Sequence, residues 1–317
     1  MELKANAIQS KIEKANEILR SCNLCGHRCG VDRTAGKRGI CGAGMEIEIA
    51  SYGPHHGEEP FISGTEGSGA IFFSRCTMKC VYCQNWEISQ TPGGVHVEAS
   101  HAAPLHEMML DLQSQGCHNI NLVTPTHFMP QILQELKIAF EKGLELPIVY
   151  NTNGYDSLEL LKILDGIIDV YMPDFKYFDD EKAKKYSDAD NYVETAKPGI
   201  QEMFRQVGNM RFDENDIAVR GLLVRHLVLP NGISDSKKVI KYLSTASRDM
   251  WISIMSQFSP QNRAKDFSEL DREITKEEYW DAVGRAQELK MENYFIQGMA
   301  SAEVFLPDFK KEKPFIQ

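Results

Sequence analysis

Short apolar runs alternate with amphipathic blocks along most of this 317-residue chain. The apolar runs have the length of buried strands and lie at residues 70–74, 119–124, 147–152, 168–173, 221–229 and 251–256. The amphipathic blocks place apolar residues at helical spacing and lie near 103–115, 129–143, 156–165, 179–208, 234–247 and 276–290. Strands that alternate with helices in this way predict a parallel sheet covered by helices.

The alternation amounts to about six βα units, which predicts an α/β fold built as a partial (β/α)6 TIM-like barrel. A doubly wound open sheet is the structural alternative. Polar residues follow four of the strands: Cys76, then Thr124–His127, then Asn151–Gly154, then Asp174 and Lys176. Because the carboxyl ends of parallel strands meet at one edge, we expect these residues to face a single cavity.

A different pattern precedes the alternating units. Residues 7–20 carry apolar side chains at helical spacing, and the glycine-rich stretch at 26–44 is typical of a loop. No low-complexity linker divides the chain. We expect an N-terminal helix with a cysteine-rich metal-binding module at 1–52, a barrel at 53–300 and a C-terminal tail at 301–317.

Composition narrows the class of protein. The chain is 42% hydrophobic and 25% charged, with a net charge of −10. These values are typical of a soluble globular protein and give no reason to expect broad nucleic-acid binding, which needs a basic surface. No apolar run approaches the ~20 residues of a membrane span, and the N-terminus lacks the features of a secretory signal. We expect a cytoplasmic protein.

The cysteines are unevenly placed. Seven of the eight fall into two groups, at 22–41 and 76–83. Cytosolic thiols stay reduced, and a chain of this length needs no disulfide to be stable, so tight grouping indicates metal ligation. Cys117 stands apart from both groups, and we interpret it as a small buried hydrophobic residue.

The central group is Cys76, Cys80 and Cys83, in the stretch Cys-Thr-Met-Lys-Cys-Val-Tyr-Cys. Three thiolates on a loop that leaves a buried strand can hold a [4Fe–4S] cluster and leave one iron without a protein ligand. An open coordination position indicates chemistry rather than a structural role. A structural zinc site would require a fourth ligand close by, and none follows in the sequence.

The N-terminal group supplies four thiolates, Cys22, Cys25, Cys29 and Cys41. Four cysteines complete the ligand set of a tetrahedral zinc ion or of a closed iron–sulfur cluster, and thiolate ligands suit both. Structural zinc is slightly favoured, because small loop-rich modules often depend on zinc to fold. His27 and Arg28 are not needed as ligands.

The Cys-x3-Cys-x2-Cys spacing, with Tyr82 before the last cysteine, resembles the signature of the radical S-adenosylmethionine (SAM) superfamily. Further similarity runs through Glu59-Pro60, Ile62-Ser63-Gly64, Gly67-Ser68-Gly69, Ile71-Phe72-Phe73 and Cys83-Gln84-Asn85. These stretches resemble the pyruvate formate-lyase activating enzyme-like branch, and the whole chain resembles its poorly characterised iron–sulfur homologues. The resemblance implies that the open iron binds SAM and that one electron cleaves it to methionine and a 5′-deoxyadenosyl radical, which abstracts hydrogen from a substrate.

The resemblance also implies a SAM pocket at the strand ends. Where the branch usually has Gly-Gly-Glu, this chain has Thr124, Pro125, Thr126 and His127, so backbone carbonyls would have to receive the SAM amino group. Two roles are equally possible for His127: a polar residue of the site, or a histidine hydrogen-bonded to the rim of the barrel. The remaining expected pocket residues are Asn151, Thr152, Asn153, Asp174, Lys176, Arg225 and Tyr82, the last by stacking on adenine.

For partners, the resemblance implies SAM and an electron donor such as a flavodoxin or ferredoxin. The leading substrate is a glycine in a partner enzyme that becomes a glycyl radical. Radical modification of another protein, a peptide or RNA is an alternative. A non-catalytic iron–sulfur or zinc protein with a regulatory or binding role is another, although an open iron has no use in such a protein.

Overall fold

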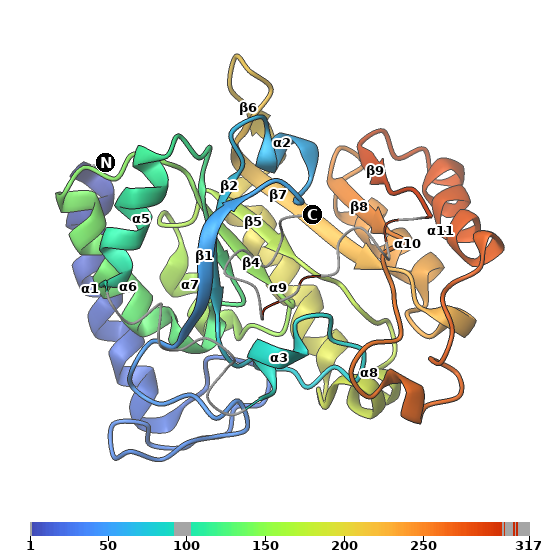
Figure 1. Ribbon diagram of the computed structural model, residues 1–317, viewed down its shortest axis with the longest axis horizontal. Coiled ribbons are helices and arrows are strands. Elements are labelled where there is room, and N and C mark those ends of the chain that lie inside the picture. Colours follow the sequence, from blue (N-terminus) through green and yellow to red (C-terminus); the bar gives the residue numbers. More distant parts are fainter. Residues whose placement is uncertain (1, 92–102, 300, 302–306, 308, 310–317) are drawn as a thin grey trace.

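The computed structural model describes residues 2–91, 103–299, 301, 307 and 309, and its strands form one curved sheet (Figure 1). The strands are β1 (Ile49–His55), β2 (Ser68–Phe73), β3 (Ile120–Val123), β4 (Ile148–Thr152), β5 (Val170–Pro173), β6 (Arg211–Phe212), β7 (Ala218–Leu227), β8 (Trp251–Met255) and β9 (Tyr294–Ile296). All six strands predicted from the apolar runs are present, each shifted by a few residues at most.

The strand order separates the two predicted architectures. It runs β1-β2-β3-β4-β5-β7-β8-β9, with β6 paired to β7. Every neighbouring pair from β2 to β9 on this path is parallel, whereas β1 lies antiparallel to β2. Sheet neighbours follow one another in the chain, so the order has no reversal of the kind that defines a doubly wound fold. The sheet is that of a partial barrel.

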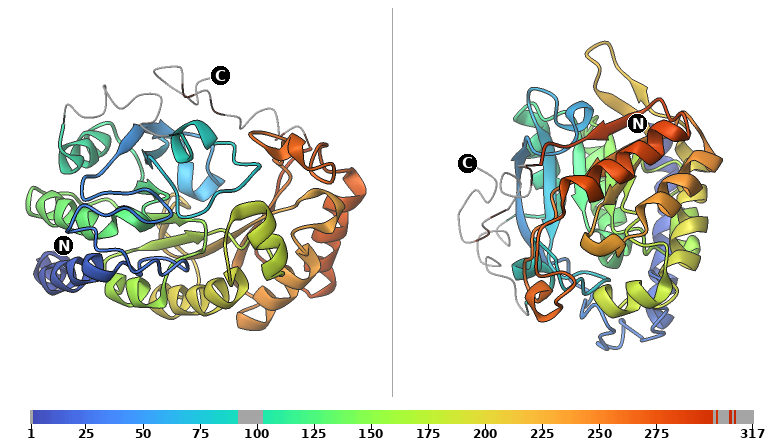
Figure 2. Two further views of the ribbon diagram at one scale, coloured as in Figure 1. Left: turned by 90° about the horizontal axis from the view of Figure 1, so that it is seen from below. Right: turned by 90° about the vertical axis from the view of Figure 1, so that its right-hand side faces the viewer.

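Helices cover the outer side of this sheet (Figure 2). The helices of the described residues are α1 (Glu2–Ile18), α2 (Pro60–Ser63), α3 (Trp86–Ser89), α5 (Leu105–Ser114), α6 (Met129–Glu141), α7 (Leu158–Leu164), α8 (Asp180–Ser187), α9 (Tyr192–Val207), α10 (Ser236–Ala246) and α11 (Lys276–Glu288), of which α2 and α3 are short and lie outside the outer layer. Short 3-10 turns are η1 (Leu19–Ser21), η2 (Thr126–Phe128), η3 (Pro230–Gly232) and η4 (Ala264–Asp266). The strands β2, β3, β4, β5, β7 and β8 are each followed by at least one helix, as the six predicted βα units require.

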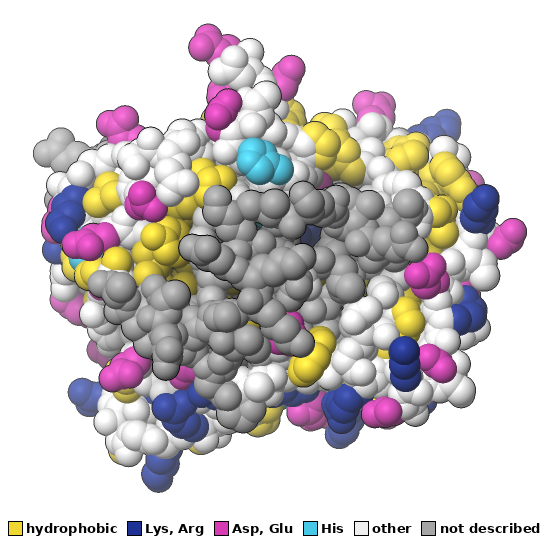
Figure 3. Space-filling view, in the orientation of Figure 1, with side chains coloured by type: hydrophobic (Ala, Val, Ile, Leu, Met, Phe, Trp, Pro, Cys, Tyr) yellow, Lys and Arg dark blue, Asp and Glu magenta, His cyan; other side chains and the backbone are white. Residues whose placement is uncertain are grey.

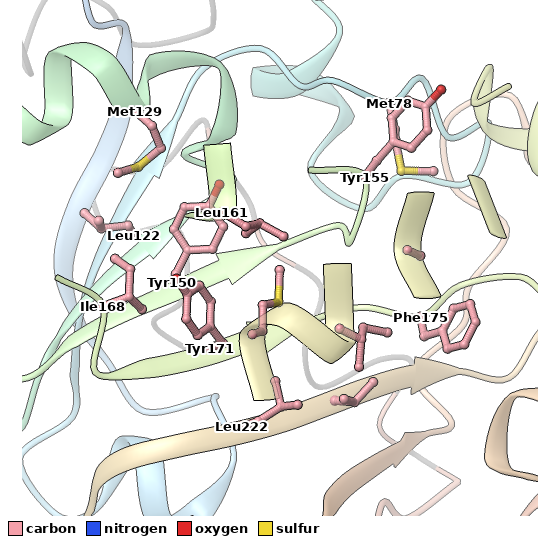
Figure 4. Close-up of a cluster of buried hydrophobic side chains, with 14 of the residues drawn as sticks. Met78, Leu122, Met129, Tyr150, Tyr155, Leu161, Ile168, Tyr171, Phe175 and Leu222 are labelled. Atoms are coloured by element: carbon pink, nitrogen blue, oxygen red, sulfur yellow. The ribbon is translucent and has the colours of Figure 1, made fainter. Parts of the chain in front are cut away.

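The main core lies between the sheet and the outer helices. Its strand side includes one row across four strands, in which Leu122 pairs with Tyr150, Tyr150 with Tyr171 and Tyr171 with Leu222. All four side chains are fully buried (Figure 4). Burial of this row fixes the strand register, because a slip of one residue would turn the row to the opposite face.

Two features of the fold differ from the sequence prediction. The block at 179–208 is two helices, α8 and α9, because Asp188 and Asn191 adopt left-handed backbone conformations with φ of 51° and 52°. Asp and Asn tolerate this conformation better than most residues. A seventh parallel strand, β9, extends the sheet beyond β8.

The N-terminal segment packs directly on the barrel. Helix α1 lies against α6 and α7, and Ile8, Ile12 and Leu24 belong to the same buried cluster as the barrel core. The predicted tail at 301–317 lies outside the described residues except for three positions. Among the described residues, no helix is long and apolar enough to cross a membrane. On the face shown in Figure 3, acidic and basic side chains are interspersed around the rim.

Candidate functional site

The three central cysteines lie on the loop between β2 and α3. Cys80 is buried, and Cys76 and Cys83 are partly buried. The loop leaves β2 by a turn at Arg75, which has a left-handed φ of 68° and is anchored through its Nε to Glu48 Oε2 at 2.7 Å. The cysteine loop is therefore held at the carboxyl edge of the parallel sheet, where the sequence pattern predicts the site.

Each of the three thiols has a hydrogen-bond partner from a different part of the chain. Asn153 Nδ2 donates to Cys76 Sγ at 3.3 Å, and Ser187 Oγ donates to Cys80 Sγ at 3.1 Å. Ser89 Oγ lies 3.4 Å from Cys83 Sγ. Asn153 follows β4, Ser187 ends α8 and Ser89 ends α3. The sulfur positions thus depend on the folded barrel as well as on the loop.

The environment of these thiols suits a metal cluster. Burial raises the pKa of the Cys83 thiol to about 12 and also raises the pKa of Cys76 and Cys80, so without metal all three are protonated at neutral pH. Coordination is what removes such a proton, and sulfur ligands suit iron–sulfur clusters. The thiols of Cys76 and Cys80 act electrostatically on Cys83, and that of Cys76 also acts on Cys80. The donor set fits a [4Fe–4S] cluster, which takes each thiolate on a separate iron.

The four N-terminal thiols also lie within electrostatic reach of one another. Burial raises the pKa of Cys25, and Cys41, Cys22 and Cys29 act in the same direction. Among the described residues, however, no three His, Cys, Asp or Glu side chains are grouped as ligands of a single metal ion. The second metal site predicted from sequence is therefore not shown.

Direct contacts join the N-terminal cysteine segment to the central loop. His27 Nε2 lies 2.8 Å from the carbonyl oxygen of Thr77, which is adjacent to Cys76. The Gly26 backbone N–H donates to the carbonyl of Tyr155 at 2.9 Å, and Cys25 forms an isolated β-bridge with Asp156. His27 is thus a structural link between the two cysteine groups.

A buried ionic network lies at the ends of β5 and β7. Lys176 Nζ donates to Asp174 Oδ2 at 2.5 Å, and Arg225 Nε donates to Asp174 Oδ1 at 3.0 Å. Burial alone would raise the pKa of Asp174, but Lys176 and Arg225 hold it below its ordinary value. Asp174 is therefore ionised at neutral pH. The structure thus brings these three predicted site residues into direct contact.

Glu58 completes the network and was not predicted. Arg225 Nη1 donates to Glu58 Oε2 at 3.2 Å, and Arg225 Nη2 donates to Asn151 Oδ1 at 2.6 Å. Asn121 and Asn151 donate to the other oxygen of Glu58. Burial raises the pKa of Glu58. The available sequence signal was the acidic pair Glu58-Glu59 directly before Pro60, of which only Glu59-Pro60 was noted, as part of the family resemblance.

Asp156 is a second residue that sequence reasoning missed. Its carboxylate accepts from Thr126 Oγ1 at 2.8 Å, from Tyr150 OH at 2.7 Å and from Thr152 Oγ1 at 2.6 Å. The hydroxyl groups of Thr126 and Thr152 are thus directed at a buried carboxylate, which locks the ends of β3 and β4 together. Their direct contact with SAM stays a prediction.

The segment Thr124–His127, which follows β3, begins with a strained turn. Thr124 has a φ of 58°, which is unusual for a β-branched residue, and its N–H donates to the carbonyl of Asn151 at 2.8 Å. Such strain is concentrated at functional sites in many proteins. The Pro125 carbonyl accepts from the N–H of Phe128 at 2.8 Å within the 3-10 turn η2. The backbone of this turn is well fixed.

His127 is paired to the barrel. Its Nε2 lies 2.8 Å from the carbonyl oxygen of Ser74, and burial lowers its pKa to about 3. The ring is therefore neutral and donates to Ser74. Of the two roles considered for His127, the geometry supports the pairing at the barrel rim.

Tyr82 is buried between the cysteine loop and the barrel. Its hydroxyl lies 2.6 Å from the hydroxyl of Tyr177, and its ring packs edge-on against Phe258 with 5.8 Å between the ring centres. Stacking of this ring on adenine stays a prediction.

Comparison with known proteins agrees with this geometry. The family model described as the radical SAM superfamily matches residues 70–210, which include the central cysteines and the ends of β2 to β5. An uncharacterized protein of Methanocaldococcus jannaschii is 30% identical over 302 residues, which cover 92% of this chain and 81% of that protein. The superfamily implies a [4Fe–4S] cluster and SAM as cofactors. The chain therefore belongs to the radical SAM superfamily.

Proposed function

We propose that this chain is a radical SAM enzyme whose cluster is held by Cys76, Cys80 and Cys83. The observation that carries the proposal is the arrangement of these three thiols. They share one loop at the carboxyl edge of the sheet, and each has a partner from a separate element. A three-thiolate set leaves one iron of a four-iron cluster open, which is the position that SAM requires.

When bound, the cluster and SAM supply a one-electron reductive cleavage of SAM to methionine and a hydrogen-abstracting 5′-deoxyadenosyl radical. The protein's part is binding and orientation. Lys176 is a counter-ion for the SAM carboxylate, and Asp174 fixes the position of its ammonium group. Arg225 donates to both Asp174 and Asn151 and so holds their side chains in place. We propose that Asn151, Asn153, Asp174 and Lys176 contact SAM.

For the substrate, we propose a glycine in a partner enzyme, with this chain as its activating enzyme. The resemblance to the pyruvate formate-lyase activating enzyme-like branch supports this choice. Another protein or a peptide would be modified by the same chemistry. RNA is less favoured, because the net charge is −10 and the visible face carries both signs of charge.

The test is production of 5′-deoxyadenosine. The protein is reconstituted anaerobically with iron and sulfide, and then SAM and a strong reductant are added. We expect product from the wild type and from Cys117→Ala, whose cysteine lies outside both groups, and a loss of at least about 100-fold in Cys80→Ala. If reconstituted wild-type protein with a full reduced cluster forms no product, the non-catalytic iron–sulfur alternative is the better account.

We further propose a second metal centre, zinc or an auxiliary iron–sulfur cluster, on Cys22, Cys25, Cys29 and Cys41. Arg33 supports it. This arginine is 1% exposed, yet its hydrogen bonds go to the carbonyls of His127 and Gly44, and among the described residues no carboxylate pairs with it. A buried guanidinium requires a compensating negative charge. Metal-bound thiolates supply that charge, and Arg33 already acts electrostatically on Cys22.

A further inference from the structure

A buried chain of hydroxyl groups ends on the sulfur of Cys80. The hydroxyls of Tyr82 and Tyr177 lie 2.6 Å apart, and the Tyr177 hydroxyl lies 2.7 Å from Ser187 Oγ. Ser187 Oγ in turn lies 3.1 Å from Cys80 Sγ. Tyr177 and Ser187 are fully buried, and Tyr82 is 5% exposed. Water therefore has little access to this chain.

The direction of the chain follows from proton counting. A cluster-bound thiolate has no proton, so Ser187 must donate to Cys80 Sγ. Each hydroxyl carries one proton, so Tyr177 must donate to Ser187 and Tyr82 to Tyr177. All three dipoles then point toward the sulfur, and each donor strengthens the next in a low-dielectric interior.

The backbone holds this arrangement in place. The N–H of Lys79 donates to the carbonyl of Ser187 at 2.9 Å, and the N–H of Val81 donates to the carbonyl of Tyr186 at 2.9 Å. The last turn of α8 is thereby fixed against the loop on both sides of Cys80. Ser187 cannot move away from the sulfur without breaking these bonds.

We propose that Ser187, supported by Tyr177 and Tyr82, is a positioning residue that raises the reduction potential of the cluster. This inference rests on the proposed function of Cys76, Cys80 and Cys83. Reduction adds negative charge to the cluster and its sulfur ligands, and a hydrogen bond to a ligand sulfur stabilises the more negative state. The donor to Cys80 thus makes the cluster easier to reduce by a cellular electron donor.

The test is an EPR-monitored redox titration of reconstituted protein without SAM. The signal assigned to the site is the one that Cys80→Ala abolishes. Ser187→Ala should shift its midpoint to a more negative potential, Tyr177→Phe by less and Tyr82→Phe by least. Ser187→Thr, which keeps the hydroxyl, should restore the wild-type value. Tyr171→Phe and Ser234→Ala remove buried hydroxyls elsewhere in the barrel and should leave it unchanged.

Three results would overturn the inference, and they differ in meaning. If the cluster assembles fully in Ser187→Ala and its midpoint equals that of the wild type, the tuning role is wrong while the cluster assignment stands. If Cys80→Ala abolishes no signal, the cluster assignment fails and the inference fails with it. A shift in Ser187→Ala that Ser187→Thr does not reverse would indicate a change in packing and would also count against a hydrogen-bond role.

Discussion

Arg225 connects more of the candidate site than any other side chain in the ionic network. It donates to Asp174, Glu58 and Asn151, and its side chain is 16% exposed. Removing one partner of a buried pair leaves the remaining charges without compensation, at a typical cost of about 3–5 kcal/mol. We therefore expect Arg225→Met to lower the free energy of unfolding by roughly 3 kcal/mol or more, measured by urea denaturation of the metal-free protein.

Arg205 offers the matched control. It also pairs with two carboxylates, those of Asp165 and Glu202, but its side chain is 56% exposed. Exposed pairs contribute little to stability, so Arg205→Met should have a much smaller effect. Equal losses in the two variants would show that the network around Arg225 is not a buried ionic cluster.

Two neutral histidines make stability depend on pH. Burial lowers the pKa of His127 to about 3 and that of His226 to about 4, from an ordinary value of 6.5. Below pH 6.5 the unfolded chain binds these protons and the folded chain does not, so stability falls as the pH decreases toward 4. Each histidine contributes a slope of up to about 1.4 kcal/mol per pH unit.

His127→Gln tests this linkage, because an amide can still donate to the carbonyl of Ser74. Urea midpoints between pH 7.5 and 5 should fall less steeply for this variant than for the wild type, whereas His56→Gln, at an exposed position, should follow the wild-type curve. A His127→Gln curve parallel to that of the wild type would mean that His127 binds its proton equally well in the folded and unfolded states, which contradicts the proposed linkage.

Sequence reasoning located the residues of the site better than their roles. Asp174 and Lys176 were predicted because strand ends share an edge of the sheet, and Arg225 was predicted from the family resemblance; the structure brings the three into contact. Glu58 was missed because it lies in the loop between β1 and α2. The spacing of apolar residues along the sequence does not show which loop residues reach the ends of the strands. Thr152 was predicted as a pocket donor, but its hydroxyl donates to Asp156, a contact that depends on two strand ends meeting in space.

At the scale of elements, the turn after β4 must pass very close to the end of β5. Gly154 has a φ of 76°, and a Cβ there would lie 2.2 Å from the carbonyl oxygen of Asp174. Gly166 has a similar φ of 80°, but a Cβ there would meet no atom of the described residues beyond its chain neighbours within 4 Å. We expect Gly166→Ala to cost roughly 1 kcal/mol from backbone strain alone and Gly154→Ala to cost at least about twice as much.

Thermal or urea unfolding of the two glycine variants measures this difference. Gly154→Ala should also reduce the amount of cluster that the protein retains, because the shifted turn carries Asn153, which donates to Cys76. If both substitutions destabilise the protein equally, the close approach of residue 154 to the carbonyl oxygen of Asp174 does not limit which side chain the turn can hold.

The elements that sequence predicted best are the buried parallel strands, because burial on both faces leaves an uninterrupted apolar run. In strand β1 only the first two residues are buried, the rest alternate between partly buried and exposed, and the strand contains Gly and Pro, so it gave no such run. The division of α8 from α9 was also missed. The break matters functionally, since it ends α8 at Ser187 and directs that hydroxyl at Cys80.

At the scale of the whole molecule, the N-terminal segment and the barrel share one core and meet beside the cysteine loop. The buried charge of Arg33 lies at this junction. We expect Arg33→Met to lose metal from the N-terminal cysteines at least about tenfold faster to a chelator than the wild type, while Arg33→Lys, which keeps the charge, loses it more slowly than Arg33→Met. Inductively coupled plasma mass spectrometry measures the zinc and iron that remain.

Arg38 provides the control for this experiment. It lies in the same segment, but its side chain is 53% exposed, so Arg38→Met should retain metal as the wild type does. Identical metal retention in all of these variants would argue against a negatively charged centre beside Arg33.

The measurement that tests the account most directly is the EPR spectrum of the reconstituted, reduced protein with and without SAM. We predict a [4Fe–4S] signal that changes shape when SAM is added, that persists in Cys117→Ala and that is lost in Cys80→Ala. A change on SAM addition requires an iron that the protein leaves open, as three thiolates do. The absence of any signal that SAM alters, or a SAM-responsive signal that survives in Cys80→Ala, would contradict a SAM-binding cluster on Cys76, Cys80 and Cys83.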